Sequence, residues 1–284
     1  MSAAPTPLAP DLGHLVRLLN GRRLSVLTGA GCSTESGIPD YRGPETRRRA
    51  RNPIQYRAFV KSRDARRRYW ARAVLGWDKF KAARPNPAHH ALASLERKGL
   101  LTGLITQNVD RLHQAAGSRN IVELHGALAD VRCIACRAVE PRAAVQARMA
   151  ELNPGWTQQQ AEMAPDGDAE LDGERIARFV LATCLMCDGD LKPDVVFFGE
   201  SVPRLRVETA YHHVESSDAL LVAGSSLAVF SGYRFVRRAE AAGLPVAIVN
   251  LGPTRGDPHA TLRVDGRLGD VLPRLAAALH PLRA

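Results

Sequence analysis

The chain has 284 residues, which is enough for one large domain or two small ones with a substantial buried core. Its 45% hydrophobic and 24% charged residues are typical of a soluble globular protein. No apolar run approaches the length of about 18 residues that a membrane-spanning helix needs. Residues 1–10 lack the basic and apolar parts of a signal peptide, and the first arginine is Arg17, unlike a mitochondrial leader. We therefore expect a cytoplasmic protein without a membrane partner.

The net charge of +10 is concentrated in one segment. Residues 42–84 hold 15 Lys and Arg against Glu45, Asp64 and Asp78, a net charge of +12. The remainder has 24 basic and 26 acidic residues, a net charge of −2. A solvated basic helix face explains this segment as well as attraction of an anionic ligand does. Its aromatic residues are spaced for a helix core as much as for base stacking, so we do not expect nucleic acid as a partner.

The apolar pattern predicts alternating strands and helices. Helices are expected at residues 11–20, 53–83 and 88–98, the last between Pro85-Asn86-Pro87 and Gly99. Short buried strands are expected at residues 24–27, 100–106, 121–124, 220–223 and 246–249. Each strand ends in glycine or polar residues. This alternation predicts an α/β fold with a doubly wound parallel sheet, whose ligands bind beyond the carboxyl ends of the strands.

The loop after the first strand is the most informative part of the chain. Gly29-Ala30-Gly31 makes a tight turn whose backbone N–H groups can approach a phosphate closely. Ser33 and Thr34 add hydroxyl groups that can cap a following helix. An ordinary sharp turn has the same glycines, however. The dehydrogenase fingerprint needs a third glycine where Thr34 stands, and an acid about 20 residues on, where the chain has the basic run 47–51. Hydride transfer therefore fails two checks.

Four of the five cysteines form two C-x-x-C hooks that are separated by 47 residues. Two such hooks can complete a tetrahedral site of four sulfur ligands, which leaves no open position for catalysis. A disulfide pair is unexpected in a cytoplasmic chain, and a thioredoxin-type motif has a single hook. We therefore predict one structural Zn²⁺ held by Cys133, Cys136, Cys184 and Cys187. The fifth, Cys32, fits a small buried side chain. The stretch between the hooks is predicted to be rich in loops.

The string from Leu24 to Gly43 resembles the first signature of the sirtuins, the NAD-consuming protein deacylases. The resemblance extends from about Leu15 to Leu275. It is strongest to the class II branch, on Asp40-Tyr41-Arg42, Tyr69-Trp70-Ala71-Arg72, Pro85-Asn86-Pro87-Ala88-His89 and Gly252-Pro253-Thr254-Arg255. It implies a Rossmann-like NAD-binding domain with an inserted small zinc-binding and helical module. The large domain would comprise residues 1–43, 85–130 and 191–284, and the small one a helical piece, 44–84, and a zinc-ribbon piece, 131–190.

The resemblance also implies a role for each matching residue. His125 resembles the catalytic base, with Asn108 and Asp110 acting in the reaction beside it. The NAD-binding residues would be Gly29, Ala30, Gly31, Ser33, Thr34, Asp40, Tyr41, Arg42, Gln107, Asn108, Val109, Asp110, Gly224, Ser225, Ser226, Asn250, Leu251, Gly252 and Leu268. Two chain edges would hold the substrate peptide as an extended strand: Val196, Phe197, Phe198, Gly199 and Glu200 on one side, and Leu227, Ala228 and Val229 on the other.

The implied reaction transfers the acyl group of a modified lysine to ADP-ribose and releases nicotinamide. His125 would accept a proton from a ribose hydroxyl, a step that suits an imidazole with a pKa near neutrality. Acylated proteins would be the partners, and a monomer is expected. Tyr69 and Arg72 lie three residues apart and would share a helix face, where they can bind an acidic acyl chain. Transfer of ADP-ribose to protein, an NADP oxidoreductase and a zinc-module nucleic-acid binder remain the alternatives.

Overall fold

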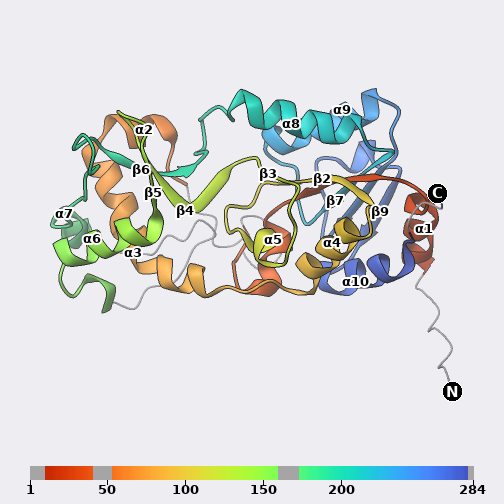
Figure 1. Ribbon diagram of the computed structural model, residues 1–284, viewed down its shortest axis with the longest axis horizontal. Helices are drawn as coiled ribbons and strands as arrows, with labels where there is room; N and C mark the ends of the chain where they lie inside the picture. The colour runs from red at the N-terminus through yellow and green to blue at the C-terminus, as the bar shows by residue number, and fades with distance from the viewer. Residues whose placement is uncertain (1–9, 41–52, 159–172, 281–284) are drawn as a thin grey trace, which may run out of the picture.

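The computed structural model describes residues 10–40, 53–158 and 173–280. The molecule is elongated, and each of its two lobes is built around its own sheet (Figure 1). The larger sheet has the strand order β3-β2-β1-β7-β8-β9, and the smaller has the order β5-β4-β6. The strands are β1 (Leu24–Thr28), β2 (Leu101–Thr106), β3 (Ile121–Glu123), β4 (Gly126–Cys133), β5 (Val139–Pro141), β6 (Leu191–Val195), β7 (Ala219–Ala223), β8 (Val246–Asn250) and β9 (Leu262–Asp265).

Every pair of neighbouring strands in the large sheet is parallel, and β1 lies between β2 and β7. Val26 of β1 is aligned with Leu104 on one side and with Leu221 on the other. The strand order runs outward in opposite directions from β1, so the connections diverge at the carboxyl ends of β1 and β7, where sheets of this kind place their ligand crevice. The predicted doubly wound α/β fold is confirmed.

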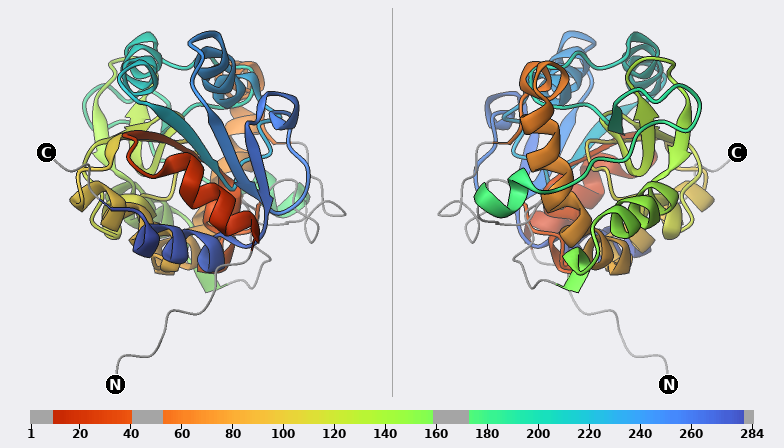
Figure 2. Two further views of the ribbon diagram at one scale, coloured as in Figure 1. Left: turned by 90° about the vertical axis from the view of Figure 1, so that its right-hand side faces the viewer. Right: turned by 90° about the vertical axis from the view of Figure 1, so that its left-hand side faces the viewer.

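Helices cover both faces of this sheet (Figure 2). One face carries α1 (Pro10–Leu19), α4 (Pro87–Arg97) and α10 (Leu268–Ala278), and the other carries α8 (Arg204–Glu215) and α9 (Phe230–Ala241). Successive side chains of β1 therefore enter different cores, with Val26 on the first face and Leu27 on the second. Both are fully buried, as strands covered on two faces require.

The smaller lobe packs helices against the three-stranded antiparallel sheet. Its helices are α2 (Tyr56–Lys61), α3 (Arg63–Ala82), α6 (Arg142–Leu152) and α7 (Gly173–Ala177). Phe59, Trp70 and Met149 lie at the centre of its core. The sequence analysis places most of β4 and all of β6 in the large domain, yet both strands pair in this small sheet. The domain boundaries themselves stay a prediction.

Short elements complete the described chain. They are α5 (Leu112–Ala115) and the 3₁₀ turns Ala30–Cys32, Thr34–Ser36, Trp156–Gln158 and Asp257–His259. Two of these turns follow the glycine turn, where the sequence analysis allows Ser33 and Thr34 to cap a helix. Ser62 divides the expected helix 53–83, since its side chain caps the start of α3 by accepting from the N–H of Ala65. The supposedly loop-rich stretch contains α6. Among the described residues, no helix has both the length and the apolar character needed to cross a membrane.

Candidate active site

The glycine turn after β1 packs directly against the turn after β7. The N–H of Gly31 donates to the carbonyl of Gly224 over 2.9 Å. A Cβ atom on Gly29 would lie 2.8 Å from the Cβ of Ser225, and one on Gly31 would lie 2.9 Å from the oxygen of Gly224. Gly224 also has a left-handed backbone, with φ of 64°. Only glycine therefore allows these two loops to meet at the point where the strand order diverges.

A chain of hydrogen bonds joins this turn to the loop after β2. The amide of Asn108 donates to the hydroxyl of Ser33 over 3.0 Å, and that hydroxyl donates to Asp110 over 2.6 Å. The other carboxylate oxygen of Asp110 accepts from the N–H of Leu112. Burial raises the pKa of Asp110, and these hydrogen bonds oppose the rise. These three side chains, all predicted to bind NAD, are thus held as one unit.

Gln107 connects the ends of β1, β2 and β7. Its side-chain amide donates to the hydroxyl of Ser225 over 2.7 Å and to the carbonyl of Thr28 over 3.3 Å. A Cβ atom on Gly232 would collide with the side-chain oxygen of Gln107, so a glycine in the first turn of α9 is needed for this approach. The first turn of α9 consequently belongs to the site, which the sequence analysis did not predict.

His125 lies at the end of β3, as predicted, with both ring nitrogens hydrogen-bonded. Nδ1 is 3.0 Å from the carbonyl oxygen of Gln107, and Nε2 is 2.8 Å from the hydroxyl of Ser231. Burial lowers the pKa of His125 to about 4, with Arg206 and Arg234 adding to the effect. The expected pKa near neutrality is therefore wrong for the free protein, because the packed site disfavours the charged ring. The neutral form, which a base requires, is the form present at pH 7.

Gly126 fixes the position of its neighbour His125. Its φ is 78°, and a Cβ atom there would collide with the backbone oxygen of Asp194 in β6. The carbonyl of His125 accepts from the N–H of Val196 over 2.8 Å. The predicted base and the first of the predicted peptide edges are therefore adjacent. Within that edge the N–H of Phe197 donates to Glu200 over 2.9 Å.

The second predicted edge is less regular. Leu227 is buried and has φ of 56°, so residues 226–229 do not form a continuous strand. The carbonyl of Ser226 accepts from the backbone N–H of Arg255, and the carbonyl of Ala228 accepts from the guanidinium of the same residue over 3.5 Å. Phe198 of the first edge accepts from the N–H of Tyr56. Both edges are thus held by neighbouring loops, and whether they carry peptide stays a prediction.

The remaining predicted residues lie around this crevice or outside the described chain. Asn250 donates to the carbonyls of Leu251 and Gly252, and Leu268 begins α10 beside Gly224. Thr34 donates to the carbonyl of Gly31, and the carbonyl of Val109 accepts from the N–H of Leu128. Ala30, Asp40 and Gly199 are described as well. Tyr41 and Arg42 lie outside the described residues.

Tyr69 and Arg72 share one face of α3, as their spacing predicts. The Tyr69 ring makes edge contacts with Phe59, Trp70 and Phe197, with centroids 5.4 to 5.5 Å apart. It therefore packs in the core of the small lobe and at the same time touches the first peptide edge. Arg72 is partly buried on the same helix.

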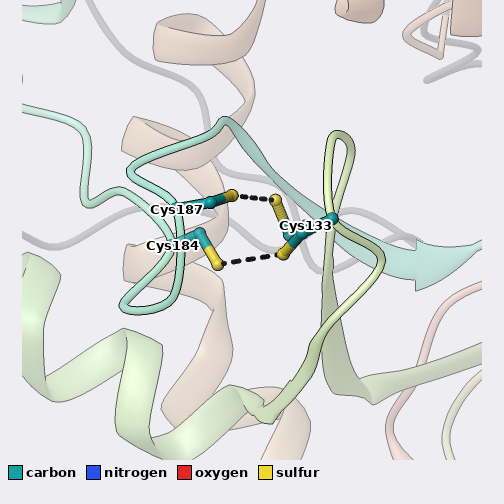
Figure 3. A group of neighbouring side chains, drawn as sticks. Cys133, Cys184 and Cys187 are labelled. Atoms are coloured by element: carbon teal, nitrogen blue, oxygen red, sulfur yellow. Dashed lines mark hydrogen bonds between the residues drawn. The ribbon is translucent and has the colours of Figure 1, made fainter.

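The four hook cysteines come together at one end of the small sheet (Figure 3). Their sulfur atoms all lie within 4.8 Å of one another, and two pairs across the hooks are 3.6 Å apart. Tetrahedral zinc with Zn–S bonds of about 2.3 Å needs sulfur atoms about 3.8 Å apart. Each hook is followed by a left-handed residue, Arg137 or Asp188. This repeated turn geometry fits the predicted Zn²⁺ closely.

Known proteins are similar to this chain in both sequence and fold. The model of the Sir2 family matches residues 29–231. The chain belongs to the Sir2 family. An NAD-dependent protein deacetylase of Bordetella bronchiseptica is 53% identical over 263 residues, which cover 92% of this chain and 96% of the relative. NAD-dependent protein deacetylase 1 of Mycobacterium avium is 52% identical over 274 residues, covering 95% and 96%.

Solved structures of Sir2 proteins superpose on nearly the whole chain. One of Sir2 with a p53 peptide and NAD⁺ has a TM-score of 0.72 and 32% identity, covering 94% of this chain and 97% of the other. One of Sir2 bound to an acetylated peptide has a TM-score of 0.71 and 30% identity, with the same two coverages. The Sir2-family resemblance predicted from the sequence is confirmed.

Proposed function

We propose that this Sir2-family protein is an NAD-dependent protein-lysine deacetylase that transfers the acyl group to ADP-ribose and releases nicotinamide. One observation carries the proposal: the neutral His125 lies within one hydrogen-bonded network with the loops after β1, β2 and β7. NAD⁺ fits this crevice because its glycine loops meet without side chains, and solved Sir2 relatives hold NAD⁺ or acetylated peptide. When bound, NAD⁺ supplies an electrophilic ribose carbon and nicotinamide as the leaving group.

The residues of this chain divide into groups by position. The glycine turn and Ser225 receive the phosphates and the adenosine side, while Ser33, Asn108 and Asp110 orient the ribose next to nicotinamide. His125 accepts the proton of a ribose hydroxyl, because its Nε2 is unprotonated at pH 7. The edges around Val196 and Leu227 bind the peptide.

The test is to incubate the protein with NAD⁺ and an acetylated peptide, and to measure free nicotinamide and deacetylated peptide. Both products should appear in equal amounts in the wild type. His125→Ala should lose deacetylation, because the base is gone, and should keep NAD⁺ affinity in a direct binding assay. Radiolabel transferred from NAD⁺ to protein, without loss of acetyl groups, would instead establish the ADP-ribosyltransferase alternative. An absence of nicotinamide would exclude both activities.

We further propose, as a refinement, that the acyl pocket prefers acidic chains and that the protein belongs to the class II branch. The contact between Tyr69 and Phe197, 5.4 Å between ring centroids, supports a pocket that ends at α3. The guanidinium of Arg72 on the same face can pair with a distal carboxylate. Succinyl peptide should then be turned over faster than acetyl peptide, and Arg72→Met should remove that advantage while sparing acetyl turnover. An unchanged preference would leave Arg72 a structural residue.

We also propose that one structural Zn²⁺ is bound by the four hook cysteines and that the protein works in the cytoplasm. All five cysteines are free in the fold, which suits a reducing compartment, where disulfides are rare and thiols stay available as zinc ligands. Acylated lysine-containing proteins would be the partners of a monomeric enzyme. Metal analysis of freshly purified protein should find one zinc per chain, and size-exclusion chromatography should find the mass of one chain.

A further inference from the structure

The hydrogen bonds of His125 define its tautomer. A carbonyl oxygen can only accept, so the contact with Gln107 places the ring proton on Nδ1. Nε2 is therefore the unprotonated nitrogen, and it has a single lone pair. The hydroxyl of Ser231, 2.8 Å away, must donate to that lone pair. In the free protein, the nitrogen that serves as the base already accepts a hydrogen bond from this chain.

The fold holds Ser231 firmly in this place. Ser231 is the second residue of α9, and its neighbour Gly232 is buried against the side chain of Gln107. The backbone of Gln107 in turn holds the opposite nitrogen of the His125 ring. The imidazole is therefore fixed between the loop after β2 and the first turn of α9. Ser231 itself is partly exposed.

We propose that Ser231 relays the proton from the co-substrate's ribose hydroxyl to His125. This inference rests on the proposed function. The O–H bond of Ser231 breaks as its proton forms a bond to Nε2, and the Ser231 oxygen takes the ribose proton in its place. The electron pair of the ribose O–H bond stays on the ribose oxygen, which becomes the nucleophile. Ser231 ends unchanged as a hydroxyl, and the new Nε2–H donates to its oxygen.

Two properties of this geometry favour a relay over direct transfer. First, a serine hydroxyl both donates and accepts, so the same oxygen can bond the neutral and the charged ring. Second, the only lone pair of the base already points at Ser231, and Gln107 keeps the ring from turning away. A proton that reaches Nε2 without moving His125 must arrive along the direction that Ser231 occupies. Burial and the charges of Arg206 and Arg234 make the protonated ring costly, so an accepting oxygen there stabilises it.

The first test separates two reactions of the same enzyme. Exchange of labelled nicotinamide into NAD⁺ in the presence of acetyl peptide reports steps before the base acts, whereas deacetylation needs the base. Ser231→Ala should lower deacetylation by about 10- to 100-fold and leave exchange near the wild-type rate. Ser231→Thr, which keeps a hydroxyl, should restore deacetylation. Thr209→Ala is the matched control, because it removes an exposed hydroxyl of α8 that donates only to the carbonyl of Leu205.

The second test needs no turnover. In free protein labelled with ¹⁵N-histidine, the Nε2 signal of His125, assigned with His125→Ala, should have the shift of a hydrogen-bonded acceptor nitrogen. Ser231→Ala should move it toward the value of a free nitrogen, and Ser231→Thr should not. Unchanged deacetylation in Ser231→Ala, equal loss of exchange and deacetylation, or an unmoved Nε2 signal would each overturn the relay. A wild type without nicotinamide release would overturn the proposed function, while the nitrogen signal would still decide whether Ser231 bonds the base.

Discussion

Acid should destabilise this protein through His89, which lies in α4 and is fully buried. Burial lowers its pKa from 6.5 to about 4, with a smaller contribution from His90. Its Nδ1 accepts from the N–H of Asn86, and its Nε2 faces the sulfur of Cys32 at 3.9 Å. In the unfolded chain His89 binds a proton as the pH falls through about 6.5, whereas in the folded chain it stays neutral until about pH 4. Stability is therefore complete above pH 6.5 and falls as the pH drops through this window.

The size of the loss follows from these two pKa values. With 6.5 in the unfolded state and about 4 in the folded state, linkage gives a loss of about 2–3 kcal/mol at pH 4.5. His125, with a pKa also lowered to about 4, adds a similar loss. Burial lowers the pKa of His113 as well, in the same direction. A domain at the lower end of the usual range of about 5–15 kcal/mol should therefore be close to unfolding at pH 4.5.

Urea unfolding at pH 7.5 and pH 4.5 tests the argument, with zinc kept constant. His89→Asn cannot be protonated, so its free energy of unfolding should fall by about 2–3 kcal/mol less than that of the wild type over this interval. Its stability at pH 7.5 will be lower through lost contacts, but that loss is the same at both pH values. His14→Asn, at an exposed position of α1, should behave like the wild type. An identical pH dependence in wild type and His89→Asn would refute the reasoning.

Three further substitutions test the site and the small lobe. Cys184→Ser should abolish zinc binding and lower the melting temperature of the small lobe, with activity falling as a consequence; retention of one zinc per chain would contradict the assigned ligands. Asn108→Ala should lower the rate of nicotinamide release roughly 100-fold, since its side-chain amide donates to the Ser33 hydroxyl and holds it in place. Asp110→Asn should do the same, because an amide has one acceptor oxygen and cannot serve both the Ser33 hydroxyl and the N–H of Leu112; normal release in either variant would remove that residue from the first step.

The sequence predicts the large sheet well because its signals are local. Short strands such as β1 and β7 are buried on both faces, so they are mostly apolar and do not alternate with exposed polar residues. The tight turn after β1 was predictable for the same reason, because its glycines are adjacent in the sequence. The strand that the analysis missed, β9, lies at the sheet edge and has one buried residue, Val264, among partly exposed ones. An edge strand has too weak an apolar pattern to stand out.

Contacts between distant segments were not predictable from one sequence. Ser231 and Gly232 stand in an ordinary amphipathic helix, and only the fold shows that they meet His125 and Gln107. A family resemblance transfers roles along matching motifs, and neither residue belongs to a motif that was matched. The low pKa of His125 is likewise a property of packing, since residues from several elements remove water from the ring. Such tertiary effects decide the protonation state of the base but leave no local pattern in the chain.

The basic segment shows how composition alone can mislead about function. Of its described residues, Arg66 is buried, donates to the carbonyls of Phe59 and Val60, and pairs with Asp190 beside a zinc hook. Arg84 donates to the carbonyls at the end of α3 in the same manner. These arginines satisfy backbone oxygens that helix ends leave without partners. Part of the charge excess is therefore structural, and it holds the small lobe together rather than marking an anionic ligand. Any acidic partner would have to bind the exposed remainder of these arginines, which includes Arg57 and Arg68.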